Sequence, residues 1–365
     1  MTEKLKNIVT VALLGALLLT LSAWAVVKPA DALSESERRP LAQLPALSGQ
    51  SLLSGRFMEQ FESYAPDQFP LREQFRSLKA FAVLDLFREK DNNGIYLSGD
   101  SAVKLEYPLR ESSIAHAAER FGYIYDRYLA PAGSRVFLSV VPDKNCYLAA
   151  DGGYPSLDYQ KLTEQLRSAL PAFSYIDLFP LLDGDSYYRT DIHWRQEKLP
   201  GVAAHIAAAM GAALTGGYTE KTLGRPFYGV YYGQAALPLA PDELRYLTSP
   251  ALDGCTVYNH ETQKTTGLYD MDKAAGNDPY ALFLSGSVSL LTIENPHAAD
   301  RELIVFRDSF GSSLVPLLAE GYRRITLVDI RYLASARLAD FIEFNGQDVL
   351  FLYSVPVLNN SETLK

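Results

Sequence analysis

The most constraining feature of the sequence is a stretch of 20 residues, Ile8 to Val27, that contains no charged side chain. A helix of that length spans roughly 30 Å, which matches the hydrocarbon core of a bilayer. Lys4 and Lys6 precede the stretch, and positive charges in this position stay on the cytoplasmic side. We therefore predict a signal anchor over residues 1–27, with the rest of the chain outside the cytoplasm. A buried core helix is the alternative.

Two short patterns bear on whether this helix is retained. Ala23-Trp24-Ala25 and Ala30-Asp31-Ala32 both match the small-residue pattern at which a signal peptidase cuts. The length favours an uncleaved helix and a single-pass protein of the cell membrane, whereas cleavage would give a secreted protein. The chain carries a net charge of −9. We expect no nucleic-acid partner, because binding a polyanion requires clustered Lys and Arg.

The rest of the chain is predicted to form an arm and one domain. Residues 28–55 are rich in Pro, Ser, Glu and Arg and are interpreted as a stalk or extended arm. Residues 56–365 are predicted to form one extracytoplasmic domain. Within it, a segment at about 215–280 is rich in Gly, Tyr and Pro and is interpreted as an insertion.

Short apolar runs alternate with helical patterns across the domain. Strands are predicted at 95–97, 134–141, 174–177, 281–284, 303–306, 324–328 and 349–353. Helices are predicted at 113–129, 156–170, 197–210 and 311–320, and as a pair over 56–88 that is broken at Phe69-Pro70. Strands that are apolar on both faces and alternate with helices indicate an α/β sandwich with a mainly parallel sheet.

The composition argues against metal and disulfide chemistry. The chain has two Cys and five His, too few for a Cys-rich zinc site or a disulfide framework, and no His has metal-ligand spacing to a second ligand. We predict no metal and no cofactor. Cys146 and Cys255 could form a bond outside the cell, but no spacing favours it, and we treat them as unpaired.

The end of the strand predicted at 303–306 carries the first candidate catalytic residue. Ser309 lies in a short turn between this strand and the helix that Gly311 opens. Ligand sites in α/β proteins lie beyond the carboxyl ends of strands, and a Ser at such a turn can expose its hydroxyl as a nucleophile. The alternative is that Ser309 or Ser312 caps the helix, which is a common use of Ser.

A serine nucleophile needs a base, usually a His that a carboxylate orients. Asp191 and His193 lie two positions apart and next to Trp194. In an extended segment, residues two apart point to the same side, so Asp191 and His193 would share one face while Ile192 points into the core. A surface His that caps the following helix is the alternative. His116, His205, His260 and His297 have no such neighbour.

Several motifs together resemble the DHHW family, which is related to the alginate O-acetylation proteins and to SGNH hydrolases. The central ones are Asp191-Ile-His-Trp194 and Asp308-Ser309-Phe310-Gly311. Others, in order, are Ser36-Glu37-x-Arg39-x-Leu41, Phe57 through Tyr64-x-x-Asp67-x-Phe69-Pro70-x-Arg72, Asn93-Gly94-Ile95-Tyr96-Leu97, Pro142-Asp143-Lys144, and Ser309 through Asp329-x-Arg331-Tyr332. The resemblance implies an SGNH hydrolase-like three-layer α/β/α fold.

The resemblance also implies roles for individual residues. Ser309 would be the nucleophile, His193 the general base and Asp191 its orienting partner. The acid and base then precede the nucleophile in the chain, which is the reverse of the order in ordinary SGNH esterases.

The sequence departs from the family pattern at two places. Ile192 replaces the first His of the family name, which should leave the other residues in place. Gly286-Ser287 lies where relatives tend to carry Gly-Gly-Asn, so the Ser287 hydroxyl would replace an amide donor to the oxyanion. We expect Gly286 and the backbone N–H of Phe310 to be further donors.

Other polar residues are candidates for binding or support. Lys144 matches a family position, and a solvated surface Lys is the alternative. Arg307 and Asp308 flank Ser309 and are interpreted as residues that fix the turn or bind substrate. Tyr228, in an aromatic cluster, could stack on sugar rings or pack in the core. Asp329 and Arg331 are interpreted as a structural ion pair.

These features predict a membrane-tethered serine O-acetyltransferase or acetylesterase that acts on a cell-envelope or secreted polysaccharide. The family analogy favours transfer, with acetyl supplied by a separate multi-pass membrane O-acyltransferase. The alternative is a non-catalytic polysaccharide-binding or assembly factor on the same scaffold.

Overall fold

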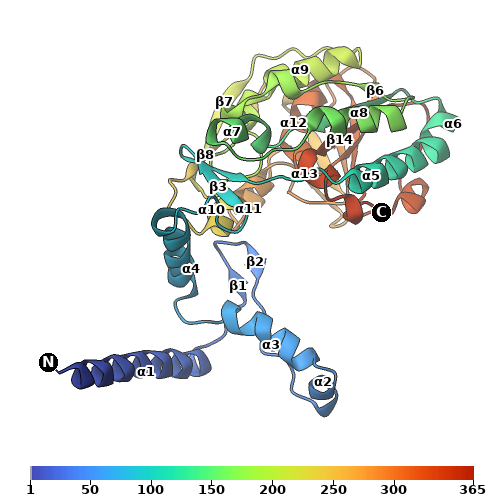
Figure 1. Ribbon diagram of the computed structural model, residues 1–365. Coiled ribbons are helices and arrows are strands. Elements are labelled where there is room, and N and C mark those ends of the chain that lie inside the picture. The colour runs from blue at the N-terminus through green and yellow to red at the C-terminus, as the bar shows by residue number, and fades with distance from the viewer. Residues whose placement is uncertain (1) are drawn as a thin grey trace. The chain divides into compact units, whose positions relative to one another are not determined.

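The computed structural model describes residues 2–365, which form two compact units (Figure 1). The first contains residues 2–93 together with Tyr232–Pro238, and the second contains Gly94–Tyr231 together with Leu239–Lys365. The domain division at residue 55 stays a prediction, and the helices that follow it belong to the first unit.

The first unit begins with α1 (Glu3–Val27), the one described helix that is long and apolar enough to cross a membrane. A small antiparallel hairpin and three short helices follow: β1 (Leu33–Ser34), β2 (Arg39–Pro40), α2 (Gly49–Leu53), α3 (Arg56–Asp67) and α4 (Arg72–Phe81). A π-helical turn, Ala82–Leu86, continues α4. The predicted pair of helices is confirmed, and so is the break between them at Phe69-Pro70. Pro70 has no N–H with which to continue a helix.

The second unit is built on one eight-stranded sheet with the strand order β10-β9-β11-β13-β12-β14-β5-β6. The strands from β13 to β6 pair in parallel, whereas β11, β9 and β10 pair antiparallel. Their bounds are β5 (Val136–Val141), β6 (Ser174–Tyr175), β9 (Thr256–Asn259), β10 (Lys264–Thr266), β11 (Leu290–Glu294), β12 (Glu302–Arg307), β13 (Arg324–Val328) and β14 (Asp348–Ser354). The predicted α/β class with a mainly parallel sheet is confirmed.

Helices cover both faces of this sheet. On one face, α9 (Pro200–Ala209) and α12 (Gly311–Leu318) pack on alternate strand residues such as Val305 and Leu352. On the other face, α5 (Glu111–Ile124) and α8 (Tyr159–Ala169) pack on the intervening residues such as Phe306 and Phe351. The central strands are therefore apolar on both faces, as parallel strands in a three-layer sandwich must be.

The remaining elements of the second unit are short. Two antiparallel hairpins are formed by β3 (Ile95–Ser98) with β4 (Ser101–Lys104) and by β7 (Thr219–Phe227) with β8 (Asp242–Thr248). The small helices are α6 (Ala130–Ala132), α7 (Asn145–Gly152), α11 (Met271–Ala274) and α13 (Val355–Leu358), and α10 (Val230–Ala235) lies at the boundary of the two units. The segment predicted as an insertion, at about 215–280, contains the β7–β8 hairpin and the strand β9, with β10 at the edge of the sheet.

The strand predicted at 281–284 is wrong. Residues Pro279–Leu282 form a 3₁₀ helix whose first turn is capped by the Asp278 carboxylate, which accepts from the N–H of Tyr280 at 3.1 Å. After Phe283, the three residues Leu284, Ser285 and Gly286 all have positive φ, at 53°, 60° and 83°. A strand requires negative φ, so the apolar run here reflects burial rather than sheet pairing.

Candidate active site

Ser309 lies in the turn that joins β12 to α12, at the carboxyl end of the sheet. The buried Asp308 holds this turn: its Oδ1 accepts from the N–H of Phe310 at 3.0 Å, and its Oδ2 accepts from the N–H and Oγ of Ser354 at 2.8 and 2.6 Å. Ser309 is partly exposed while its neighbours on both sides are buried. The turn therefore presents one hydroxyl at the surface.

Two further observations define this turn. The N-cap position of α12 is Phe310 and has no side-chain cap, so the alternative that a Ser caps this helix is excluded. A Cβ on Gly311 would lie 2.8 Å from the Cβ of Arg307, so the close approach of strand and helix requires glycine. The backbone path that exposes Ser309 therefore depends on residue 311 having no side chain.

Asp191 and His193 lie in a tight loop rather than in the extended segment that we predict. The loop is closed by a bridge between Tyr187 and Trp194, and the N–H of Tyr188 donates to the carbonyl of His193 at 3.1 Å. Asp191 Oδ1 accepts from the N–H of His193 at 3.0 Å and lies 2.6 Å from His193 Nδ1. The extended geometry is wrong, but an Asx turn brings the carboxylate and imidazole together instead.

The other imidazole nitrogen completes a chain of hydrogen bonds. His193 Nε2 lies 2.8 Å from Ser309 Oγ. Asp191 Oδ2 accepts from the N–H of Val230 at 2.8 Å, and this carboxylate is buried. When Nδ1–H donates to Asp191, the lone pair of Nε2 is free to accept the Ser309 proton. The structure thus brings all three residues into the order carboxylate, imidazole and hydroxyl.

Aromatic packing fixes the imidazole from the side. The ring of Tyr280 stacks on His193 with centroids 3.9 Å apart and an interplanar angle of 10°. Tyr280 Oη lies 2.9 Å from Ser313 Oγ, which also accepts from Trp194 Nε1 at 2.9 Å. Burial raises the pKa of Tyr280 well above its usual value. Sequence reasoning missed Tyr280 and Ser313, since neither belongs to a local pattern.

Two of the three expected oxyanion donors are already engaged. The N–H of Phe310 donates to Asp308, and the N–H of Gly286 donates to the carbonyl of Phe283 at 3.1 Å. The third expected donor, the hydroxyl of Ser287, belongs to an exposed residue seven positions after Tyr280. Within the part of the chain that the structure describes, the N–H of Ser309 itself has no hydrogen-bond partner.

Lys144 is buried, so the alternative of a solvated surface Lys is excluded. Its Nζ donates to the carbonyls of Ala102, Tyr188 and Arg189, the last two at 2.8 and 3.1 Å. Burial lowers the pKa of Lys144 to about 7. Lys144 therefore supports the loop that carries Asp191.

Replacing Lys144 with Met should lower the free energy of unfolding by about 2–4 kcal/mol, because three carbonyls lose a donor. This is a net value, since the protein no longer has to bury a charge, which offsets part of the loss. The pH dependence separates this role from simple packing. The lysine has a pKa of 10.5 in the unfolded chain, so the unfolded state binds more protons between pH 7 and 10 and wild-type stability gains from rising pH there. Denaturant titrations of both proteins measure this.

The matched control is Lys221→Met, which removes an exposed lysine. It should leave the pH dependence of unfolding unchanged. Parallel stability curves for wild type and Lys144→Met between pH 7 and 10 would contradict the assignment.

The other predicted residues lie around this centre. Arg307 is fully buried, and its Nη1 donates to the carbonyl of Asp308 at 3.3 Å and to Ser312 Oγ at 3.2 Å, which agrees with the turn-fixing alternative. Tyr228 is 42% exposed, and its neighbour Phe227 is buried in the core. Asp329 and Arg331 form the predicted ion pair, at 2.6 Å.

Two further predictions concern the pairing of cysteines and the binding of metal ions. Cys146 and Cys255 are both free thiols. Among residues 2–365, no group of three or more His, Cys, Asp or Glu side chains is placed to hold a metal ion.

Comparison with solved structures places this fold. A DHHW family protein from Eubacterium siraeum aligns with a TM-score of 0.62 and 21% identity, covering 75% of this chain and 95% of that chain. PatB1 from Bacillus cereus aligns with a TM-score of 0.60 and 18% identity, covering 74% and 98%, and its structure with a sulfonyl adduct with 0.57 and 19%, covering 72% and 95%.

The O-acetyltransferase domain of Pseudomonas putida AlgJ aligns with a TM-score of 0.46 and 16% identity, covering 73% and 92%. No protein-family model and no curated protein matches the chain. The conclusion about the fold rests on the first two proteins. The resemblance indicated by the motifs is confirmed at the level of the fold, which is a three-layer α/β/α sandwich with a mainly parallel sheet.

Proposed function

We propose that the chain is a membrane-anchored, extracytoplasmic serine O-acetyltransferase or acetylesterase that acts on a cell-envelope or secreted polysaccharide. One observation carries the proposal: Ser309 Oγ lies 2.8 Å from His193 Nε2, whose Nδ1 lies 2.6 Å from Asp191. A partly exposed hydroxyl, an imidazole and a buried carboxylate in this order are the groups needed for acyl transfer.

The reaction would proceed in two halves. Ser309 Oγ attacks the acyl carbonyl while its proton passes to His193 Nε2, and His193 then returns that proton to the leaving group. In the second half, His193 takes a proton from a sugar hydroxyl or from water, whose oxygen attacks the acyl-Ser309 ester. The bond between the acyl carbon and Ser309 Oγ then breaks, and His193 Nε2 returns the proton to Ser309 Oγ. Asp191 stabilises the imidazolium in both halves. The N–H of Ser309 and the hydroxyl of Ser287 would donate to the oxyanion.

The N-terminal helix supports the compartment that we propose. α1 fits a single-pass anchor or a signal sequence. With Lys4 and Lys6 retained in the cytoplasm, the second unit would face outward. A separate multi-pass membrane O-acyltransferase would then supply the acetyl group for transfer.

The engaged N–H groups of Phe310 and Gly286 favour one alternative, a non-catalytic polysaccharide-binding or assembly factor. Loss of oxyanion donors typically costs about 10²–10³ in rate. A scaffold with too few donors would bind glycans without turning them over.

A chromogenic acetyl ester and a sulfonyl fluoride, each added to the purified full chain, distinguish an acyl-transfer enzyme from a non-catalytic binding factor. PatB1 has been obtained with a sulfonyl adduct, which makes this reagent the suitable probe. We expect ester turnover and one adduct on the peptide that contains Ser309, detected by mass spectrometry. A folded protein that shows neither would support the binding factor. Adding an oligosaccharide separates transfer, which yields acetylated sugar, from hydrolysis, which yields acetate.

A further inference from the structure

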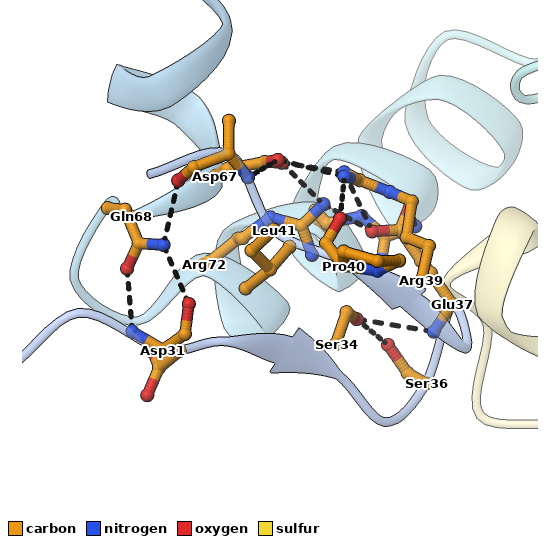
Figure 2. Close-up of polar contacts among 12 residues, drawn as sticks. Asp31, Ser34, Ser36, Glu37, Arg39, Pro40, Leu41, Asp67, Gln68 and Arg72 are labelled. Carbon is orange, nitrogen blue, oxygen red and sulfur yellow. Dashed lines mark hydrogen bonds and ion pairs between the residues drawn. The ribbon is translucent and has the colours of Figure 1, made fainter. Parts of the chain in front are cut away.

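The first unit has an inverted distribution of polar and apolar side chains. Its interior is polar: Asp67 is 8% exposed, Gln68 is 3% exposed, and Arg72 and Arg76 are largely covered. Figure 2 shows Asp67, Gln68 and Arg72 where they meet residues of the β1–β2 hairpin. In a water-soluble unit of this size, apolar side chains would occupy this interior.

A network of ion pairs holds this interior together. Arg39 donates to both carboxylate oxygens of Asp67, at 2.6 and 2.8 Å, and this contact lowers the pKa of Asp67 to about 2. Glu37 pairs with Arg72 and, at 3.1 Å, with Arg76. The basic side chains at the start of α4 are therefore turned inward and neutralised.

The apolar side chains of the same unit face outward. On α4, Leu71, Phe75 and Leu78 recur at helical spacing on one side, with Phe75 42% and Leu78 59% exposed. We call the exposed side chains of Phe69, Leu71, Phe75 and Leu78 the apolar face; the rings of Phe69 and Phe75 contact each other, with centroids 5.5 Å apart.

Hydrogen bonds tie the apolar face to the end of α1. The N–H of Asp31 donates to Gln68 Oε1 at 2.8 Å, and Gln68 Nε2 donates to the carbonyl of Asp31 at 2.8 Å. Asp31 follows the last residue of α1, Val27, by four positions, so Gln68 lies within about 15 Å of the helix end. The neighbouring Phe69 is a member of the apolar face.

We propose that the apolar face lies in the interfacial layer of the membrane that α1 spans, with the ion-paired interior above it. The proposal rests on the proposed anchoring of α1. A span of 25 residues brings the unit to the bilayer surface, and an exposed surface this rich in Phe and Leu is stabilised by contact with lipid acyl chains. Because Arg39, Arg72 and Arg76 are paired internally, we expect the contact to depend mainly on apolar burial.

Site-directed spin labelling tests this on the full chain in phosphatidylcholine vesicles. In a background of Cys146→Ser and Cys255→Ala, single cysteines replace Phe75, Leu78 or Leu13, and nitroxide labels report access to oxygen, which concentrates in lipid, and to a nickel chelate, which stays in water. The matched controls are Ser77→Cys, exposed and about 200° around α4 from Phe75, and Tyr258→Cys, an exposed position on β9 of the second unit.

We expect the ratio of oxygen access to nickel access at Phe75 and Leu78 to approach that at Leu13 and to exceed that at both controls severalfold. High nickel access at Phe75 and Leu78 overturns the proposal. Low access to both reagents also overturns it, because a protein surface, such as a second copy, then covers the face. High nickel access at Leu13 refutes the anchoring as well. Circular dichroism checks each fold, and because no readout uses catalysis, failure of the proposed acyl transfer would not change these outcomes.

Discussion

Replacing Ser309 with Ala should lower kcat for an acetyl ester by about 10⁴- to 10⁶-fold and abolish the sulfonyl adduct. The reason is that an alanine side chain has no oxygen to attack the acyl carbonyl. Among the described residues, Ser309 Oγ is the one hydroxyl that is hydrogen bonded to His193 Nε2. The fold should survive. Ser309 is partly exposed and its side chain makes one hydrogen bond, so the loss of stability should be about 1 kcal/mol. Stopped-time ester assays and thermal melting measure the two effects separately.

Ser289→Ala is the matched control for this result. Ser289 is another partly exposed serine of the second unit, and its loss should leave turnover unchanged. A Ser309→Ala protein that keeps more than about a tenth of wild-type turnover would remove Ser309 from the mechanism. It would leave open an enzyme with a different nucleophile.

Replacing Asp191 with Asn should lower kcat by about 10³- to 10⁴-fold, while the protein stays folded. An Asn side chain can offer its NH₂ group to Nδ1, which favours the tautomer with the proton on Nε2. His193 Nε2 then cannot accept the proton of Ser309, although the two atoms stay close. The rate of sulfonyl labelling should fall with kcat, because both reactions need the same activated hydroxyl.

Asp242, the first residue of β8, provides a matched control because its carboxylate holds the same loop. Its carboxylate accepts from the N–H groups of Arg189 and Thr190 at 2.9 and 2.8 Å, and it is not hydrogen bonded to His193. Asp242→Asn should therefore reduce stability more than it reduces kcat, whereas Asp191→Asn should do the reverse. If both variants lose activity in proportion to their loss of stability, Asp191 has only a structural role.

Local chemistry explains which parts of the fold could be predicted. Pro70 lacks a donor and cannot continue a helix, and the apolar runs of β5, β12, β13 and β14 were correctly predicted as buried strands. The apolar run at 281–284 has a similar composition, but it follows Pro279, and Leu284 within it and the next two residues have positive φ. Nothing in its hydrophobicity distinguishes these two outcomes.

The candidate site also contains some residues that could be predicted from the sequence and others that could not. Asp191 and His193 could be paired from their spacing, although the Asx turn that joins them differs from the extended segment we expected. Tyr280 could not be found, because its stacking on His193 depends on long-range packing of a loop that is distant in sequence. The polar interior of the first unit was also missed, since composition alone indicated an arm.

The pairing of β12 with β14 has a consequence for the order in which the site forms during export. Asp308 is held by Ser354, and Ser354 ends a strand that is synthesised after the helix that follows Ser309. If the chain is exported as we propose, the turn can take its final shape only after residues 348–354 have also been translocated. The Ser309 hydroxyl would then reach its final position only after this strand has crossed, which would place the proposed chemistry on the far side of the membrane.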